Sequence, residues 1–250
     1  MIGVVIHTYN EERNIKDCII SARLLSKEIL VVDMYSKDNT VKIAKKAGVR
    51  VKFFPFHRYV EPAREFGIKN TRADWVFILD ADERITKELA EEIKNRIGKE
   101  RFSSYKAPRK NFFLGKVFMR HGGWYPDYQI RLLKKSAFVH WPEEIHSTPK
   151  IKGEQGILEQ PILHFFHRDF NQMVEKTITF ESIEANLLFE HNRKSGVFIF
   201  FRKFLGELYR RLIRNKGFLD GGFGVIEAFY QAYSKTITYI FLKELYEKKK

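Results

Sequence analysis

The first half of the chain alternates short apolar runs, rich in β-branched and aromatic residues, with segments of helical periodicity. The apolar runs occupy residues 2–7, 28–33, 49–54 and 75–79. Their length and composition predict strands, and the runs 2–7 and 75–79 are typical of buried strands in a parallel sheet. Between the first two runs, apolar side chains recur every three or four positions at Ile15, Ile19, Ala22 and Leu25, which predicts a helix. This alternation predicts an α/β fold with a mainly parallel sheet flanked by helices.

Polar side chains cluster where three of these strands end. The clusters are residues 8–12, 33–38 and 80–83. In open α/β sheets, ligands bind outside the carboxyl ends of the strands. We therefore expect the three clusters to gather at one edge of the sheet and to form the binding site.

The third cluster is the most acidic, with Asp80, Asp82 and Glu83 directly after a buried strand and before Thr86, a predicted helix N-cap. Like charges this close repel one another unless a cation lies among them. Carboxylate oxygens suit Mg²⁺ or Mn²⁺, and Mg²⁺ usually binds through one or two carboxylates and the phosphates of a substrate. The alternative, a solvated acidic turn, stays open on this motif alone.

Composition and charge narrow the class of protein. The chain has 250 residues, 44% hydrophobic content, 30% charged residues and a net charge of +14. A folded core and an anionic partner are expected, such as nucleotide phosphates, nucleic acid or an acidic membrane surface. The single cysteine excludes an internal disulfide and structural zinc is not indicated, so a reducing compartment is expected.

Several other classes lack their sequence signals. There is no Gly-x-Gly-x-x-Gly and no Gly-x-x-x-x-Gly-Lys-Ser/Thr, which argues against a dinucleotide fold and a phosphate-loop NTPase. The N-terminus has no basic region before its apolar run, so no signal peptide is expected. No apolar run reaches the ~18 residues of a membrane span. We expect a cytoplasmic protein.

The character of the chain changes near residue 160, which predicts a domain of residues 1–160 and a helical region of residues 161–250. Helical patterns cover residues 170–190, 197–215 and 226–246, and the second combines aromatic anchors with a basic face. Such a helix is typical of a membrane-surface element, and equally of an amphipathic helix packed on the catalytic domain. His164 and His167 are three residues apart, a spacing compatible with a metal pair, but their aromatic neighbours favour core or hinge roles.

Four segments together resemble the successive motifs of the family 2 inverting glycosyltransferases. They are Thr8-Tyr-Asn-Glu-Glu, Val31-Val-Asp33-x-x-Ser36-x-Asp38-x-Thr40, Ala63-Arg64 and Leu79-Asp80-Ala-Asp82-Glu83. The resemblance covers about the first 150 residues. It implies the GT-A fold, a Rossmann-like sheet that binds nucleotide-diphospho-sugars.

The resemblance also implies roles for the site residues. Asp33 would contact the nucleobase, Asp80 the ribose and Asp82 the metal ion, while Arg64 would lie near the diphosphate. Thr8, Tyr9 and Glu11 would line the nucleoside pocket. A solvated charge on a helix is the alternative for Arg64. The second motif reads Asp33-Met-Tyr-Ser36 instead of the usual Asp-Asp-Gly-Ser, so base specificity stays open.

An inverting transfer needs a base that deprotonates the acceptor hydroxyl. Asp127, followed by Gln-x-Arg-Leu-Leu, is similar to the catalytic acid position of the family, and Glu144 is the second candidate. A turn residue after Pro126 is the alternative for Asp127. Trp124 and Tyr125 offer flat faces suited to sugar rings, and we assign them, with Arg131, to contact with sugar or acceptor.

The C-terminal segment Gly217-Phe-Leu-Asp-Gly221 and the tail resemble the lipopolysaccharide-core β-glucosyltransferase branch, in which C-terminal helices bring the enzyme to a lipid-borne acceptor. The resemblance implies a Mg²⁺- or Mn²⁺-dependent transfer of a sugar, with glucose expected, from a UDP-sugar to a lipid-linked or glycan acceptor. The enzyme would associate peripherally with the inner face of the cell membrane, an anionic surface, and no nucleic acid is expected as partner.

Two other interpretations remain. A polyprenyl-phosphate glycosyltransferase of the same fold would use an acceptor that is already ionised. A non-catalytic protein that binds an anionic membrane or nucleic acid would account for the charge and the aromatic residues, but not for the acidic motifs.

Overall fold

The computed structural model describes residues 1–98, 101–166 and 169–249, and this part of the chain forms two compact units. The first unit contains Met1–Arg109 and Asp127–His164, and the second contains Lys110–Pro126 and Phe165–Lys250. The predicted boundary after residue 160 lies close to the passage from His164 to Phe165. It did not place residues 110–126 in the second unit, where Phe113 and Met119 share a small core with Phe166 and Met173.

The first unit is built on a parallel sheet that begins at the N-terminus. Its strands are β1 (Ile2–Thr8), β2 (Ile29–Asp33), β3 (Arg50–Phe53) and β4 (Trp75–Asp80). β1 pairs in parallel with β2 on one side and β4 on the other, and β2 pairs with β3. β1, β2 and the apolar part of β4 are buried, as expected for strands covered on both faces.

Beyond β4 the sheet becomes mixed. β8 (Asp127–Lys134) runs antiparallel to β4, and β6 (Phe102–Phe113) runs antiparallel to β8. The strand order is β3-β2-β1-β4-β8-β6-β12-β5, with β12 (Ile162–His164) and β5 (Glu83–Arg84) at the far end. The short strands β7 (Val117–Phe118) and β11 (Glu154–Ile157) also pair with β6, and β9 (Phe138–His140) pairs with β10 (Lys150–Ile151).

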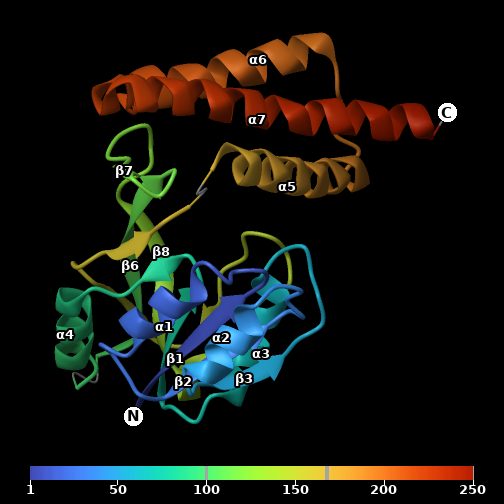
Figure 1. Ribbon diagram of the computed structural model, residues 1–250. Helices are drawn as coiled ribbons and strands as arrows, with labels where there is room; N and C mark the ends of the chain where they lie inside the picture. Colours follow the sequence, from blue (N-terminus) through green and yellow to red (C-terminus); the bar gives the residue numbers. More distant parts are fainter. Residues whose placement is uncertain (99–100, 167–168, 250) are drawn as a thin grey trace. The chain divides into compact units, whose positions relative to one another are not determined.

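Helices cover both faces of this sheet (Figure 1). α1 (Ile15–Ala22), α2 (Thr40–Lys46) and α4 (Lys87–Arg96) pack on one face, and α3 (Glu61–Asn70) packs on the other. The hydroxyl of Thr86 accepts a hydrogen bond from the Leu89 amide at 3.1 Å, which confirms the predicted N-cap of α4. The predicted mainly parallel sheet flanked by helices is thus confirmed, with an antiparallel extension.

The second unit is helical. Its elements are α5 (Phe170–Glu190), α6 (Val197–Leu208), a π-helical turn (Tyr209–Arg214), a 3₁₀ turn (Gly217–Asp220) and α7 (Gly221–Lys248). α7 lies against α5 and α6 (Figure 1). Buried Glu181 of α5 accepts hydrogen bonds from Ser234 and Thr238 of α7, which satisfies the carboxylate where the helices meet. Among the described residues, no helix combines the length and the apolar character needed to cross a bilayer.

Candidate active site

The carboxyl ends of β1, β2 and β4 meet at one edge of the first unit, as predicted. In the sheet register, Thr8 is paired with Asp33, and His7 is paired with Asp80. The loop after β1 is tied to the loop after β2, because Thr40 Oγ1 accepts the Glu11 amide at 2.7 Å. Parallel strand pairing therefore brings the three polar clusters of the sequence together.

Asp33 forms the buried floor of this edge. Its carboxylate accepts hydrogen bonds from the Ser36 amide at 2.8 Å and from the Ser36 hydroxyl at 2.5 Å. Tyr9 packs its half-buried ring on Phe56, with 4.5 Å between ring centroids. Thr8 Oγ1 is buried and has no hydrogen-bond partner among the described residues, so a ligand group could satisfy it. The structure thus places Thr8, Tyr9, Glu11 and Asp33 at one site, and their contacts with a nucleoside stay predictions.

Two buried arginines hold the carboxylate of Asp80. Arg64 Nη2 lies 2.7 Å from Asp80 Oδ1, and Arg131 Nη2 lies 2.8 Å from Asp80 Oδ2. Burial by itself would raise the pKa of Asp80, but the charges of Arg131 and Arg64 outweigh it and hold that pKa well below its usual range. Asp80 is therefore ionised at neutral pH. The side chain of Arg64 is only 6% exposed, so the interpretation as a solvated helix charge is wrong.

His7 of β1 contacts the guanidinium of Arg64. Its Nδ1 lies 3.3 Å from Arg64 Nη1, and its Nε2 lies 3.2 Å from the carbonyl oxygen of Ala63. Burial, reinforced by the charge of Arg64, lowers the pKa of His7 to about 3. The imidazole is therefore neutral, donates from Nε2 to Ala63 and accepts from Arg64 at Nδ1. His7 adds no charge to the site and orients the guanidinium.

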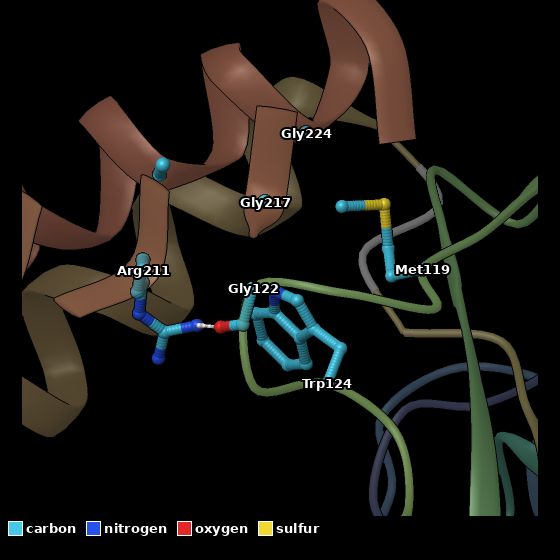
Figure 2. Close-up of a pocket in the computed structure, with 7 residues that line it drawn as sticks. Met119, Gly122, Trp124, Arg211, Gly217 and Gly224 are labelled. Carbon is cyan, nitrogen blue, oxygen red and sulfur yellow. Dashed lines mark hydrogen bonds between the residues drawn. The ribbon is translucent and has the colours of Figure 1, made fainter. Parts of the chain in front are cut away.

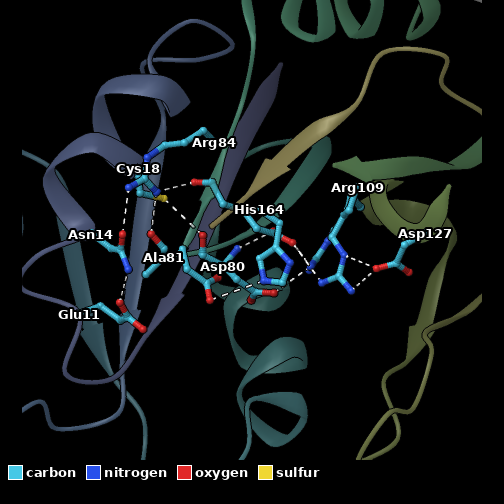
Figure 3. A network of polar contacts seen from close by, with 12 residues as sticks. Glu11, Asn14, Cys18, Asp80, Ala81, Arg84, Arg109, Asp127 and His164 are labelled. Carbon is cyan, nitrogen blue, oxygen red and sulfur yellow. Dashed lines mark hydrogen bonds and ion pairs between the residues drawn. The ribbon is translucent and has the colours of Figure 1, made fainter. Parts of the chain in front are cut away.

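A chain of alternating charges runs from Asp80 to Asp127. Arg131 Nη2 lies 2.5 Å from Glu83 Oε1, and Arg109 Nη1 lies 3.5 Å from the same oxygen. Arg109 also donates to Asp127 Oδ2 from Nε at 2.8 Å and from Nη2 at 2.5 Å (Figure 3). β6 and β8 pair Arg109 with Asp127 in register, which sets this contact.

The other oxygen of Asp127 is also engaged. Gln129 Nε2 donates to Asp127 Oδ1 at 2.8 Å. Asp127 is 24% exposed. Contacts to both oxygens fix the direction of the carboxylate. The site therefore has an ionised acid at one end, Asp80, and an oriented carboxylate at the other.

Asp82 lies beside a histidine. Asp82 Oδ2 is 3.6 Å from His164 Nε2, and both side chains are 15% exposed. β12 brings them together, because His164 is paired with Glu83 of β5. A carboxylate and an imidazole are ligands for divalent transition metals. Within the described ranges, no group of three or more His, Cys, Asp or Glu is arranged to hold a metal ion, and His167 lies outside those ranges.

Two predicted residues have surroundings that differ from the expectation. Arg131, assigned to contact with sugar or acceptor, is 5% exposed and is bound to Asp80 and Glu83. Its geometry makes it a clamp for two acids, and this corrects the prediction. Glu144 is exposed in a loop anchored to α3, where Glu65 accepts the Trp141 amide at 2.9 Å. The structure thus joins Asp127, and not Glu144, to the network of Asp80.

Trp124 and Tyr125 belong to the second unit. The ring of Trp124 stacks on Phe166 with 4.8 Å between centroids. The guanidinium of Arg211 lies 5.0 Å from the centroid of the Trp124 ring, and Figure 2 shows these two side chains beside each other. These contacts occupy the ring, so the predicted sugar platform is not supported for Trp124. Tyr125 makes an edge contact with Phe118 and precedes a cis peptide bond to Pro126. A sugar contact of Tyr125 stays a prediction.

Sequence reasoning missed Arg109 and undervalued His164. The sequence does contain a signal that points to a partner such as Arg109. Asp127, Gln129 and Arg131 alternate along one strand and so share a polar face. A partner for that face had to come from the neighbouring strand. No local signal pairs His164 with Asp82, because 81 residues separate them in the chain.

Known proteins resemble this chain in sequence and in fold. The family model described as "Glycosyl transferase family 2" matches residues 3–173. An uncharacterized glycosyltransferase of Rickettsia conorii is 24% identical over 259 residues, which cover 97% of this chain and 90% of the relative.

Two solved structures share the fold. The structure of S. aureus TarS 1–349 in complex with UDP-GlcNAc has a TM-score of 0.52 at 14% identity, and the match covers 95% of this chain and 81% of that chain. The second is glucosyl-3-phosphoglycerate synthase of Mycobacterium tuberculosis, in complex with Mn²⁺, UDP and phosphoglyceric acid. Its TM-score is 0.52 at 16% identity, and the match covers 75% of this chain and 77% of that chain. At such identity the likeness concerns the fold, which is of the GT-A type.

Proposed function

Because the chain belongs to glycosyl transferase family 2 and is a glycosyltransferase, we propose that it is a metal-dependent inverting enzyme with a UDP-sugar donor. It transfers the sugar, with glucose expected, to a hydroxyl group of a lipid-borne or glycan acceptor. The observation that carries this proposal is the network that links the ionised acid Asp80 to the oriented carboxylate of Asp127 through Arg131, Glu83 and Arg109.

The donor binds at the edge formed by β1, β2 and β4. Thr8, Tyr9 and Asp33 surround the nucleoside, and the buried Thr8 hydroxyl has no partner in the part of the chain that the structure describes. Asp80 contacts the ribose. Two proteins of the same fold were crystallised with UDP or a UDP-sugar, which supports a UDP-sugar for this chain. The resemblance of residues 217–221 to the lipopolysaccharide-core branch supports a lipid-borne glycan as acceptor.

Asp82 and His164 fit the role of metal ligands. Asp82 Oδ2 and His164 Nε2 lie 3.6 Å apart and offer a carboxylate and an imidazole from neighbouring strands and turns. Asp82 and His164 would hold the ion, and the donor diphosphate would supply further oxygen ligands, as substrate phosphates commonly do for Mg²⁺. A divalent ion held there would offset the charge that develops on the leaving diphosphate.

Asp127 acts as the base. It accepts the proton of the acceptor hydroxyl, whose oxygen forms the new bond to the anomeric carbon while the bond from that carbon to the diphosphate breaks. The bonding electron pair leaves with UDP. Arg109 and Gln129 hold one oxygen each of the Asp127 carboxylate. A fixed direction places the accepting oxygen for the reaction, as general-base catalysis requires.

Titration calorimetry with UDP tests the donor and metal site. We expect Mn²⁺ to strengthen UDP binding to the wild type. In the presence of Mn²⁺, Asp82→Asn and His164→Gln should each bind UDP at least about tenfold more weakly than the wild type. Asp17→Asn, on the exposed side of α1, is the matched control and should keep it. Absence of UDP binding with any metal would overturn the donor, and binding that does not respond to metal would overturn the metal site.

Comparison of two acids tests the base. Asp127→Asn should lower kcat by about 10²–10⁴, whereas Glu144→Gln, in its exposed loop, should leave kcat almost unchanged. UDP release by each variant gives the rates. A large loss for Glu144→Gln with a small loss for Asp127→Asn would reverse the assignment. Small losses for both would favour an acceptor that is already ionised, such as a polyprenyl phosphate.

A further inference from the structure

α6 and the π-helical turn after it carry a row of large apolar side chains that the protein leaves uncovered. Val197, Phe201, Leu205, Tyr209 and Ile213 are between 51% and 71% exposed. They are spaced four residues apart, so they form one continuous stripe that turns slowly around the helix. No residue of either element is buried.

α7, which lies against α6, has a similar stripe. Phe223, Ile226, Tyr233 and Ile240 are between 42% and 59% exposed and recur at three- or seven-residue spacing. The opposite face of α7 is buried at Ala228 and at other small residues. Two adjacent helices thus expose apolar stripes, far beyond the scattered apolar residues that ordinary surfaces show.

Basic side chains border these stripes. Arg202, Lys203, Arg214 and Lys216 are exposed, and Glu207 is the one acid among residues 197–216. Glu207 is ion-paired with two further arginines, at 2.5 Å from Arg210 Nη2 and at 2.7 Å from Arg211 Nε. Its negative charge is therefore neutralised within the helix, and the exposed charge of this segment is positive.

The combination of charge and apolar surface selects the occupant. A second copy of the chain would place these cations against cations, on a protein of net charge +14, and like charges in contact oppose association. The surface of a bilayer with anionic lipids offers phosphate groups for the cations and an acyl boundary for the apolar side chains. It satisfies both features.

We propose that α6, the π-helical turn and α7 form a docking surface for membranes that contain anionic lipid. The helices lie parallel to the bilayer, with Phe201 and Leu205 in the boundary between headgroups and acyl chains. Arg202 and Arg214 contact lipid phosphates. This binding needs neither the donor nor the acceptor, and so it goes beyond the transfer reaction.

Flotation of the full chain with lipid vesicles tests the proposal. We expect binding to vesicles of phosphatidylcholine and phosphatidylglycerol, and much weaker binding to phosphatidylcholine alone. Phe201→Ser and Leu205→Ser should each weaken binding about tenfold. Arg202→Gln and Arg214→Gln should each weaken it about fivefold at low salt. All four positions are exposed, so the variants keep the fold, which circular dichroism verifies.

Matched controls come from the first unit. Ile20→Ser and Ile157→Ser replace apolar side chains of similar exposure, 52% and 49%, and Lys46→Gln removes an exposed cation of α2. These variants should bind vesicles as the wild type does. Equal binding by the α6 variants and the controls would overturn the proposal, as would equal binding to neutral and anionic vesicles. If the wild type formed dimers and did not bind vesicles, and if Phe201→Ser dissociated these dimers, the surface would be an interface between two copies of the chain.

Discussion

Arg131 is expected to stabilise the first unit strongly, because it bridges Asp80 to the fully buried Glu83. The side chain of Glu83 is fully buried, and the Arg131 contact at 2.5 Å is its shortest ion pair. Arg109 reaches the same oxygen only at 3.5 Å. In Arg131→Met, Glu83 would keep a buried charge without a close partner. Removing one member of a buried ion pair typically costs 3–5 kcal/mol, and we expect a loss of about 4 kcal/mol at neutral pH.

The pH dependence of this loss has a defined sign. The pKa of Asp80 is lowered in the folded state, so its stabilising contribution is present above the unfolded value of 3.8 and is lost as the pH falls through the folded pKa. Arg131→Met raises the folded pKa of Asp80, although Arg64 still contacts the carboxylate. The difference in stability between wild type and variant should therefore be largest at neutral pH and shrink below about pH 4.

Hydrogen exchange in increasing urea measures this effect where it arises. Amides of β4 and β8 report the first unit and amides of α5 and α7 report the second, so unfolding of each compact unit is followed separately. Arg72→Met is the matched control, since Arg72 is exposed, and it should change stability by less than about 0.5 kcal/mol. A loss below about 1 kcal/mol for Arg131→Met, or a loss that grows at low pH, would refute the reasoning.

Two further predictions concern the second unit. A Cβ on Gly224 would lie 2.0 Å from the carbonyl oxygen of Gly217, so Gly224→Ala should destabilise the helices by about 1–3 kcal/mol. Gly222→Ala meets no atom within 4 Å and should be neutral or stabilising by about 0.5–1 kcal/mol in urea unfolding followed by circular dichroism. Burial raises the pKa of Glu227 from 4.5 to about 7, so its contribution to stability is lost as the pH rises between these values. The free energy of unfolding of Glu227→Gln should therefore rise by about 3 kcal/mol relative to that of the wild type as the pH increases from about 5 to about 8. The exposed variant Glu244→Gln should show no such rise. If Glu227→Gln showed none either, the raised pKa of Glu227 would be refuted.

The parallel half of the sheet could be predicted because its information is local. Buried strands read as unbroken apolar runs, and polar residues at their carboxyl ends must converge once the strands are parallel. The paired register of Thr8 with Asp33 and of His7 with Asp80 bears this out. The N-cap at Thr86 was equally local.

The contacts between β4, β8 and β6 could not be predicted, because they depend on register between distant strands. Arg109 meets Asp127 only through the pairing of β6 with β8. The pattern of residues 110–126 gave no sign that this segment belongs with the C-terminal helices. The burial of Arg131 is also a product of register, since an arginine next to apolar residues in sequence is as often exposed as clamped between acids.

The distribution of charge shows whether the excess positive charge lies in the active site or on another surface of the protein. A net charge of +14 predicts an anionic partner, but the charged network of the active site is almost balanced. It contains four acids and three arginines: Asp80, Asp82, Glu83, Asp127, Arg64, Arg109 and Arg131. The excess positive charge must therefore lie elsewhere, and exposed cations on and after α6 account for part of it. Vesicle binding should thus weaken steeply with ionic strength, because exposed charges are screened. Metal-dependent UDP binding should respond far less, since the groups that hold Asp80 are buried.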